Sequence, residues 1–306
     1  MTSPRNRILV IKHGALGDII QGLDAYASLR ASFKDAMIAV LTSAPFAGLM
    51  RSMPYFDEVY VDKRAPFWRV DKTLTIASIL RNDFDIIIDL QCSSRTAAYH
   101  RYLVQSGQDW IGNAPNCSHP YPDFTGIHNT ERMLTAVKMA GAAPIQADLS
   151  FFKTEEGLDM PSPYGLIMPG CSPAKPSKRW PFYKDLAALL AKDGITPVII
   201  GTLVDKQACD EVAEQVPEAV NLCQKTSLSQ LANLAASSAI SVGNDSGTIF
   251  LCAKTNAPAL MIMGPDTDER MSAPTGRQAD FIKTEDMHNL SAEAVYKHLS
   301  QTRLKR

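Results

Sequence analysis

A short glycine-containing loop near the N-terminus carries the first residues that could do chemistry. It reads His13-Gly-Ala-Leu-Gly-Asp18, and its glycines let backbone amides approach a ligand where the next helix begins. Asp18 is the carboxylate that we expect to face the ligand site. An Asp in the first turn of a helix also stabilises the helix dipole, and taken alone the loop favours that structural role. His13 could act as a base or line the loop, and lining is favoured. The GxGxxG spacing of a dinucleotide site is missing.

A second loop concentrates positive charge. The segment 169–181 holds four prolines together with Lys175, Lys178 and Arg179. A proline-stiffened loop loses little entropy when it orders, so we predict a preformed phosphate clamp in preference to a merely solvated basic loop. Lys178 is the favoured phosphate contact.

A third loop reads Gly243-Asn-Asp-Ser-Gly247 and follows an apolar run at 239–242. A helix is predicted to begin at about Ser246, so the free amides of its first turn could hold a diphosphate. Asp245 or Ser246 would serve equally well as a plain N-cap, which is the commoner role for such residues. The loop alone therefore leaves both interpretations open.

The elements that must position these loops alternate between strands and helices. In the first half, apolar runs and helical patterns are predicted as strands at 8–11, 37–41, 58–61 and 86–88 and as helices at 18–32, 73–81 and 95–105. The second half repeats the pattern, with strands at 164–168, 197–200, 239–242 and 259–262 and helices from Asp205, Leu228 and Ser291. Runs that are apolar throughout indicate parallel sheets covered by helices. We therefore predict an α/β chain of two doubly wound, Rossmann-like domains, 1–155 and 162–306, with ligands bound at the carboxyl ends of the strands.

The composition argues against several classes of protein, namely nucleic-acid-binding, metal-binding, exported and membrane-inserted proteins. The chain has 31 Lys and Arg against 32 Asp and Glu, so it has no global field to attract nucleic acid or an anionic membrane. Its six cysteines are scattered without a CxxC pair or a Cys/His cluster, which favours a reduced cytoplasmic chain without a metal site. Residues 1–7 are polar and no span of about 18 apolar residues follows, so we expect neither export nor membrane insertion.

The order and spacing of four motifs together resemble glycosyltransferase family nine, the heptosyltransferases that build the inner core of lipopolysaccharide. The motifs are Gly14-Ala-Leu-Gly-Asp18, Asp89-Leu-Gln91, the block from Pro169-Gly to Lys178-Arg-Trp-Pro181, and Gly243-Asn-Asp-Ser-Gly247. The resemblance spans nearly the whole chain. It implies the GT-B architecture, with the first domain binding the acceptor and the second an ADP-linked sugar, and it implies no metal or other cofactor.

Roles for individual residues follow from the same resemblance. Transfer in the family inverts the anomeric centre, which would make Asp18 the general base that takes the proton of the acceptor hydroxyl. Lys178 and the amides at Ser246, Gly247 and Thr248 would stabilise the leaving diphosphate. Asp205 lies where the family commonly has a Glu that binds the ribose hydroxyls. The full set of candidate donor-binding residues is Ser172, Lys175, Lys178, Asp205, Asp245, Ser246, Gly247 and Thr248.

A basic and aromatic segment is the candidate acceptor site. Lys63, Arg64 and Arg69 surround Pro66-Phe67-Trp68, and a related segment in the family contacts the anionic Kdo-lipid acceptor. Exposed basic residues are ordinarily only solvated, and both interpretations stay open. The full set of candidate acceptor-binding residues is Gly17, Lys63, Arg64, Arg69 and Arg95.

One departure from the family pattern supports alternative functions. The family usually has a histidine three residues after the Asp-Ser-Gly motif, whereas this chain has Phe250. A nucleotide-sugar-binding protein without transfer is therefore a second hypothesis, and a nucleotide-sugar epimerase of the same architecture is a third. The expected partners are a nucleotide-sugar donor and an anionic glycolipid or oligosaccharide acceptor. We expect a cytoplasmic protein with at most peripheral contact with the inner face of the inner membrane.

Overall fold

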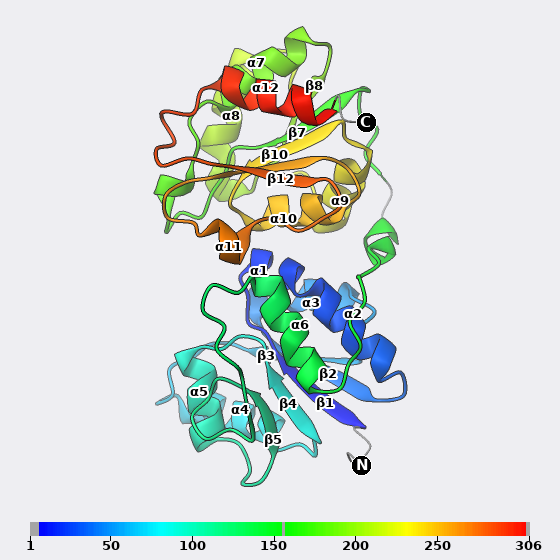
Figure 1. Ribbon diagram of the computed structural model, residues 1–306, viewed down its shortest axis with the longest axis vertical. Coiled ribbons are helices and arrows are strands. Elements are labelled where there is room, and N and C mark those ends of the chain that lie inside the picture. The colour runs from blue at the N-terminus through cyan, green and yellow to red at the C-terminus, as the bar shows by residue number, and fades with distance from the viewer. Residues whose placement is uncertain (1–5, 155–156, 304–306) are drawn as a thin grey trace. The chain divides into compact units, whose positions relative to one another are not determined.

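The computed structural model describes residues 6–154 and 157–303 (Figure 1). Contacts within the chain divide it into two compact units, residues 1–151 and 152–306, here called unit 1 and unit 2. The division falls between Phe151 and Phe152, within the short 3-10 helix η2 (Ser150–Thr154). Each unit consists of one sheet with helices on both of its faces.

Unit 1 contains a six-stranded parallel sheet in the order β3-β2-β1-β4-β5-β6. Its strands are β1 (Arg7–Ile11), β2 (Met37–Ser43), β3 (Glu58–Asp62), β4 (Ile86–Asp89), β5 (Asp109–Gly112) and β6 (His119–Pro120). In the register, Ile11 pairs with Leu41 on one side and with Asp89 on the other. The carboxyl ends of β1 and β4 therefore meet at the point where the strand order reverses, which is where open α/β sheets bind ligands.

Six α-helices cover the sheet of unit 1 within the described residues. They are α1 (Leu16–Gln21), α2 (Leu23–Ser32), α3 (Ala47–Ser52), α4 (Val70–Leu80), α5 (Ser94–Tyr102) and α6 (Asn129–Met139), and the 3-10 helix η1 (Ala44–Phe46) precedes α3. The single helix predicted over 18–32 was wrong, because the structure has two helices that meet at Gly22. The aromatic ring of Tyr26 lies over Gly22, where a β-carbon would stand 2.5 Å from the tyrosine oxygen.

Unit 2 repeats the arrangement with the strand order β12-β11-β10-β7-β8-β9, again parallel. Its strands are β7 (Tyr164–Met168), β8 (Thr196–Ile199), β9 (Val220–Asn221), β10 (Ile240–Asn244), β11 (Ala259–Met263) and β12 (Ala279–Lys283). Its helices are α7 (Tyr183–Lys192), α8 (Lys206–Gln215), α9 (Leu228–Ser237), α10 (Gly247–Lys254), α11 (Glu269–Ser272) and α12 (Ala292–Arg303), with 3-10 helices η3 (Pro176–Lys178) and η4 (Leu203–Asp205). Here the strand order reverses between β7 and β10.

The two buried cores follow from the apolar strands. In unit 1, Leu9, Ile11 and Ile87 pack with the fully buried Trp110, and in unit 2, Ile167 and Val242 pack with the buried Trp180. The prediction of two doubly wound parallel sheets is confirmed. Among the described residues, no helix is both long and apolar enough to cross a lipid bilayer.

Candidate active site

The loop between β1 and α1 is held in a fixed conformation. The backbone N–H of His13 donates to the side-chain oxygen of Gln91 at 2.8 Å, and the Ser43 hydroxyl donates to the His13 carbonyl at 2.5 Å. Gly14 has φ +131°, and a β-carbon there would stand 2.3 Å from the ring of Phe46. Only glycine fits such a position without strain, so the loop depends on this residue.

This loop presents Asp18 on the third residue of α1. Its carboxylate accepts the backbone N–H of Ala15 at 3.1 Å, so Asp18 does fill the structural role expected of a first-turn acid. The side chain is nevertheless 40% exposed, and it lines a cavity of about 120 Å³. Gly17, one residue earlier, is half-buried in the same turn.

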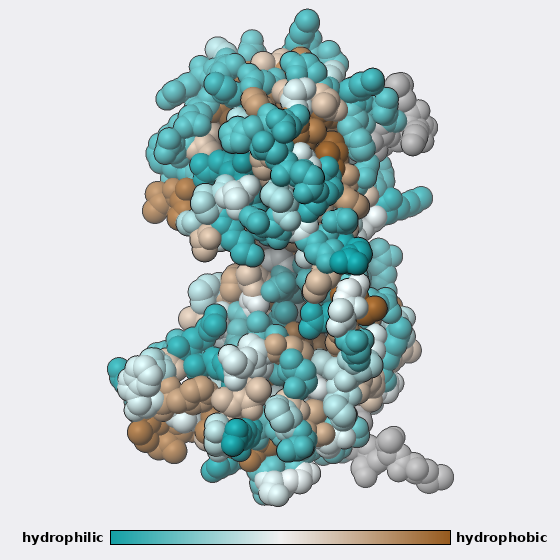
Figure 2. Space-filling view, turned by 60° about the vertical axis from the view of Figure 1, so that its left-hand side comes forward, coloured by the Kyte–Doolittle hydropathy of each residue, from teal (hydrophilic) through white to brown (hydrophobic). Residues whose placement is uncertain are grey.

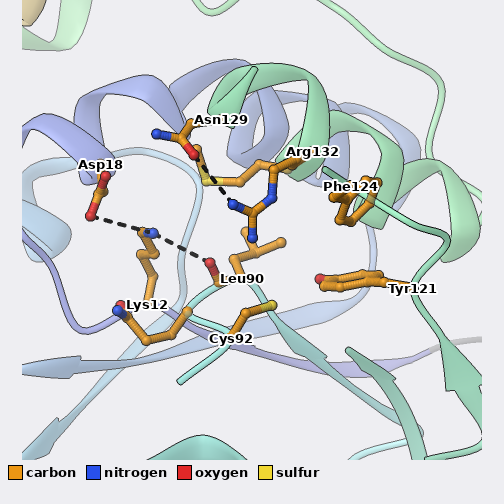
Figure 3. Close-up of a pocket in the computed structure, with 10 residues that line it drawn as sticks. Lys12, Asp18, Leu90, Cys92, Tyr121, Phe124, Asn129 and Arg132 are labelled. Carbon is orange, nitrogen blue, oxygen red and sulfur yellow. Dashed lines mark hydrogen bonds and ion pairs between the residues drawn. The ribbon is translucent and has the colours of Figure 1, made fainter. Parts of the chain in front are cut away.

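The cavity beside Asp18 lies at the carboxyl ends of β1 and β4, with α6 on its other side (Figure 3). It is lined by Lys12, Asp18, Leu90, Gln91, Cys92, Tyr121, Phe124, Asn129, Arg132 and Met133. Most of these residues follow a strand directly or stand in the first turns of a helix. The cavity therefore occupies the ligand position of a doubly wound sheet.

Lys12 lines the same cavity and forms an ion pair with Asp18. Its ammonium donates to the Leu90 carbonyl at 3.3 Å and lies 4.0 Å from the Asp18 carboxylate (Figure 3). Burial lowers the pKa of Lys12 below its usual value of 10.5, while the charges of Asp18, Cys92 and Asp89 oppose this shift. Sequence reasoning missed Lys12, although its place directly after an apolar strand was a usable signal.

Arg132 supplies a second positive charge to the cavity. It comes from α6, donates to the Asn129 side-chain oxygen at 3.4 Å, and places its guanidinium 5.5 Å from the centre of the Phe124 ring (Figure 3). Its Nε atom is buried without a hydrogen-bond partner in the described structure. Arg132 and Asn129 were not predicted, because the helix that carries them was not predicted either.

Asp89 is the last residue of β4 and holds the turn that leads from this strand into the cavity. Its carboxylate accepts the backbone N–H groups of Gln91 at 3.0 Å and Cys92 at 2.9 Å, which shapes the turn after β4. Burial raises the pKa of Asp89 to about 6. The Tyr121 hydroxyl donates to the Asp89 carbonyl at 2.7 Å and so ties the segment before α6 to the strand end.

Asp62, at the end of β3, anchors the basic and aromatic segment. Arg95 of α5 donates to its two carboxylate oxygens at 2.8 and 3.0 Å, and donates again to the Ala65 carbonyl at 3.0 Å. The Tyr99 hydroxyl also donates to Asp62. Arg95 was predicted to contact the acceptor, but its side chain is only 18% exposed and its donors are engaged within unit 1. It is placed to hold this segment.

His13 lies on the other side of Asp62. Its Nε2 atom is 3.4 Å from an Asp62 oxygen, and burial lowers the pKa of the ring to about 4. The ring is therefore neutral at pH 7, and it is buried between the loop and Asp62. Lys63 and Arg64 are exposed and border a second cavity of about 320 Å³ next to this loop. Arg69 is exposed at the N-terminus of α4.

In unit 2, the second and third predicted loops come together through Asn244. Its side-chain nitrogen donates to the carbonyls of Pro169 and Gly170 at 3.1 and 2.9 Å, and its oxygen accepts the backbone N–H of Trp180 at 2.9 Å. Trp180 is buried, so both ends of the segment 169–181 are fixed to the end of β10.

This arrangement brings Lys178 onto Asp245, with which it forms an ion pair. Asp245 also accepts the Thr267 hydroxyl at 2.8 Å. Both charged side chains are largely buried, whereas Ser172 and Lys175 are exposed on the same loop. The position of the Lys178 ammonium is therefore set by Asp245 before any ligand binds.

The N-terminus of α10 is open. Ser246 is the N-cap residue, but its side chain makes no capping hydrogen bond and instead contacts the Thr248 hydroxyl at 3.1 Å. Asp245 is engaged by Lys178, so the structure does not use it as the plain N-cap that the sequence allowed. The first amides of a helix have no intrahelical partner, which leaves those at Gly247 and Thr248 suited to an anion.

Two further positions bear on the predicted donor site. The Asp205 carboxylate is buried and accepts the backbone N–H and the hydroxyl of Thr202 at 2.9 and 2.7 Å, close against Gly170. It therefore borders the segment 169–181, with one oxygen used by Thr202. Phe250 is buried in α10 and belongs to the interior of unit 2.

The described residues contain no group of three or more His, Cys, Asp or Glu side chains placed to hold a metal ion.

Two proteins named as heptosyltransferases are similar to this chain in sequence. The chain is 32% identical to lipooligosaccharide heptosyltransferase 2 of Haemophilus influenzae over 115 residues, which span 35% of this chain and only 33% of that relative. It is 24% identical to the protein of the same name from Haemophilus ducreyi, over 92% of this chain and 89% of the relative.

Solved structures and a family pattern extend the comparison. The structure of Escherichia coli heptosyltransferase WaaC with ADP is similar over 97% of this chain and 99% of that one, with a TM-score of 0.78 and 20% identity, which shows that the fold is GT-B. The pattern of glycosyltransferase family 9 (heptosyltransferase) matches residues 74–300, which is most of the chain. The protein therefore belongs to the heptosyltransferases of glycosyltransferase family 9.

Proposed function

We propose that this glycosyltransferase moves a heptose, or a related sugar, from an ADP-linked donor to a lipopolysaccharide core or another envelope glycan. The observation that carries the proposal is the pairing of Lys12 with Asp18 at the ligand position of unit 1, in a chain that belongs to this family. Relatives named as heptosyltransferases, one of them solved with ADP, support the choice of donor. In this proposal unit 1 binds the acceptor and unit 2 binds the donor.

Asp18 is the proposed general base. The acceptor hydroxyl oxygen attacks the anomeric carbon, its proton passes to the Asp18 carboxylate, and the bond from the sugar to the diphosphate breaks with inversion. The Lys12 ammonium lies 4.0 Å from this carboxylate and is the cation that faces it in the cavity.

The leaving diphosphate is the proposed ligand of Lys178 and of the α10 N-terminus. Lys178 is already positioned by Asp245, so it can meet the growing negative charge with little rearrangement. The free amides at Gly247 and Thr248, and the helix dipole behind them, act on the same charge. This stabilisation requires no metal ion.

The acceptor is the proposed ligand of the positive residues in unit 1. Lys63 and Arg64 border the cavity next to the β1–α1 loop, and Arg132 lines the cavity beside Asp18. An anionic group of the acceptor, such as a sugar carboxylate, would find charge-assisted donors there. Gly17 and Arg69 complete the proposed acceptor side.

The test is a transfer assay with purified protein, ADP-heptose and a core acceptor, with the product detected by mass spectrometry. We expect product only when both substrates are present. Donor consumption without acceptor would support an epimerase, and donor binding without either reaction would support a nucleotide-sugar-binding protein. Either result would overturn the transferase proposal.

A further inference from the structure

An exposed apolar surface stands at the beginning of α4. Phe67, Trp68, Val70 and Leu74 are 39%, 80%, 64% and 62% exposed, and we call these four residues the α4 patch. Figure 2 shows brown, apolar surface on unit 1 among teal, white and tan residues. Several large apolar side chains gathered on one short segment are more than the scattered exposed residues of an ordinary surface.

Positive charge surrounds the α4 patch. Between positions 63 and 74 the sequence has four basic residues, Lys63, Arg64, Arg69 and Lys72, and a single acid, Asp71. The side chains of Arg69 and Lys72 are 60% and 41% exposed, although both lie near Asp71. This segment therefore carries a net charge of about +3 in a chain whose overall charge is −1.

Within the α4 patch, Phe67 is held by contacts with other residues of unit 1. The Arg95 guanidinium lies 5.1 Å from the centre of the Phe67 ring, and the Tyr99 ring meets Phe67 edge-on at 6.0 Å. The Thr73 hydroxyl donates to the Phe67 carbonyl at 2.9 Å. Phe67 is thus held by contacts within unit 1, whereas the neighbouring Trp68 is 80% exposed.

We infer that the α4 patch docks the enzyme on an anionic lipid surface. Val70 and Leu74 are one helical turn apart and so share a face of α4, and tryptophan is favoured at the boundary between headgroups and acyl chains. Basic residues beside such an apolar face attract anionic headgroups. The basic residues would match an acidic protein as well, but a tryptophan that is 80% exposed beside an apolar helix face is the feature that the boundary of a lipid bilayer favours, so the lipid surface is the occupant that we infer. Lys63, Arg64 and Arg69 are also proposed to contact the acceptor, whereas Trp68, Val70 and Leu74 have no role in the proposed transfer reaction.

Tryptophan fluorescence tests this inference directly. The chain has three tryptophans, and since Trp110 and Trp180 are fully buried, a change in emission on binding reports Trp68. The full-length protein is titrated with vesicles of phosphatidylcholine alone and of phosphatidylcholine mixed with phosphatidylglycerol. We expect a blue shift and protection from iodide quenching with the mixed vesicles only, weakened by added salt.

Substitutions test whether the α4 patch is the surface that binds the vesicles. The double variant Val70→Ser/Leu74→Ser should weaken vesicle binding at least tenfold, and Lys72→Gln should weaken it roughly fivefold, the effect of one cation near such a membrane. Leu203→Ser/Val204→Ser, which alters two equally exposed apolar residues of unit 2, is the matched control and should bind like the unaltered chain. Circular dichroism and thermal unfolding establish that each variant is folded.

Three results would overturn the inference. The first is an unchanged Trp68 emission with phosphatidylglycerol vesicles, and the second is an equal shift with phosphatidylcholine alone. The third is a shift that depends on protein concentration without vesicles, which would assign the α4 patch to self-association.

Discussion

Removing the ammonium of Lys178 tests the donor site most directly. In Lys178→Met the Asp245 carboxylate, only 10% exposed, loses its cation and keeps only the Thr267 hydroxyl among its described side-chain donors. A hydrogen bond from a charged donor to a phosphate contributes about 1.5–3 kcal/mol. ADP affinity should therefore fall roughly 10- to 150-fold, with further loss from repulsion between the bare Asp245 and the diphosphate.

A double variant separates these two contributions. Removing one partner of a buried ion pair costs about 3–5 kcal/mol of stability, and Lys178→Met should lose an amount near the lower end of that range because both side chains are slightly exposed. Lys178→Met/Asp245→Asn removes the unpaired charge, so it should recover most of that stability and part of the ADP affinity. Lys175→Met, on the exposed part of the same loop, should change ADP affinity less than about fivefold, since an exposed charge contributes about 1 kcal/mol or less.

The assay is isothermal titration calorimetry with ADP, together with thermal unfolding of each variant. Lys178→Met that is folded and still binds ADP like the unaltered chain would refute the assignment of Lys178 to the diphosphate. Equal losses in Lys178→Met and Lys175→Met would show that the loop acts only through its general charge.

Three further predictions concern unit 1. Asp18→Asn should lower kcat by about 100- to 10,000-fold while ADP affinity changes less than twofold. Steady-state kinetics measures kcat and calorimetry measures the ADP affinity, and an unchanged kcat would rule out Asp18 as the base. Arg95→Met should raise the acceptor KM more than it lowers kcat, because the Asp62 anchor of the basic segment is lost; an unchanged KM would rule out this positioning role. The pKa of His13 is lowered to about 4, so between pH 6.5 and 4 the unfolded chain binds more protons and acid destabilises the fold through His13. The pKa of Asp89 is raised to about 6, so between pH 6 and 3.8 the folded chain binds more protons and acid stabilises it through Asp89. Urea unfolding at pH 7 and pH 5 should therefore show His13→Gln gaining about 2 kcal/mol on acidification, relative to the unaltered chain, and Asp89→Asn losing about 1.3 kcal/mol; parallel curves would contradict both assignments.

The sequence predicted most of the strands that bury an unbroken run of apolar residues, but not β5. The strand at 164–168 was placed with the bounds that the structure has, because every residue of β7 is buried. It did not predict β12, whose five residues are all half-buried and form no apolar run. Likewise, the division of the predicted helix at Gly22 was missed, and only the structure shows that the Tyr26 ring lies where a side chain at position 22 would stand.

The candidate site was predictable where neighbours in sequence are neighbours in space. Asp18 and Lys178 each stand in a motif that can be read locally. Lys12 and Arg132 line one cavity from positions 120 residues apart, and the pair of Arg95 with Asp62 joins positions 33 residues apart, so neither grouping is visible before the chain is folded.

The three hydrogen bonds of Asn244 have a thermodynamic consequence for the donor loops. Because one side chain joins both ends of the segment 169–181 to β10, ordering these loops is part of folding and adds little entropy cost to ligand capture. Aspartate has the same shape but lacks the N–H groups that bind the Pro169 and Gly170 carbonyls. Under the proposed function, an alteration at Asn244 would thus weaken donor binding, even though the amide itself is bound to the protein backbone.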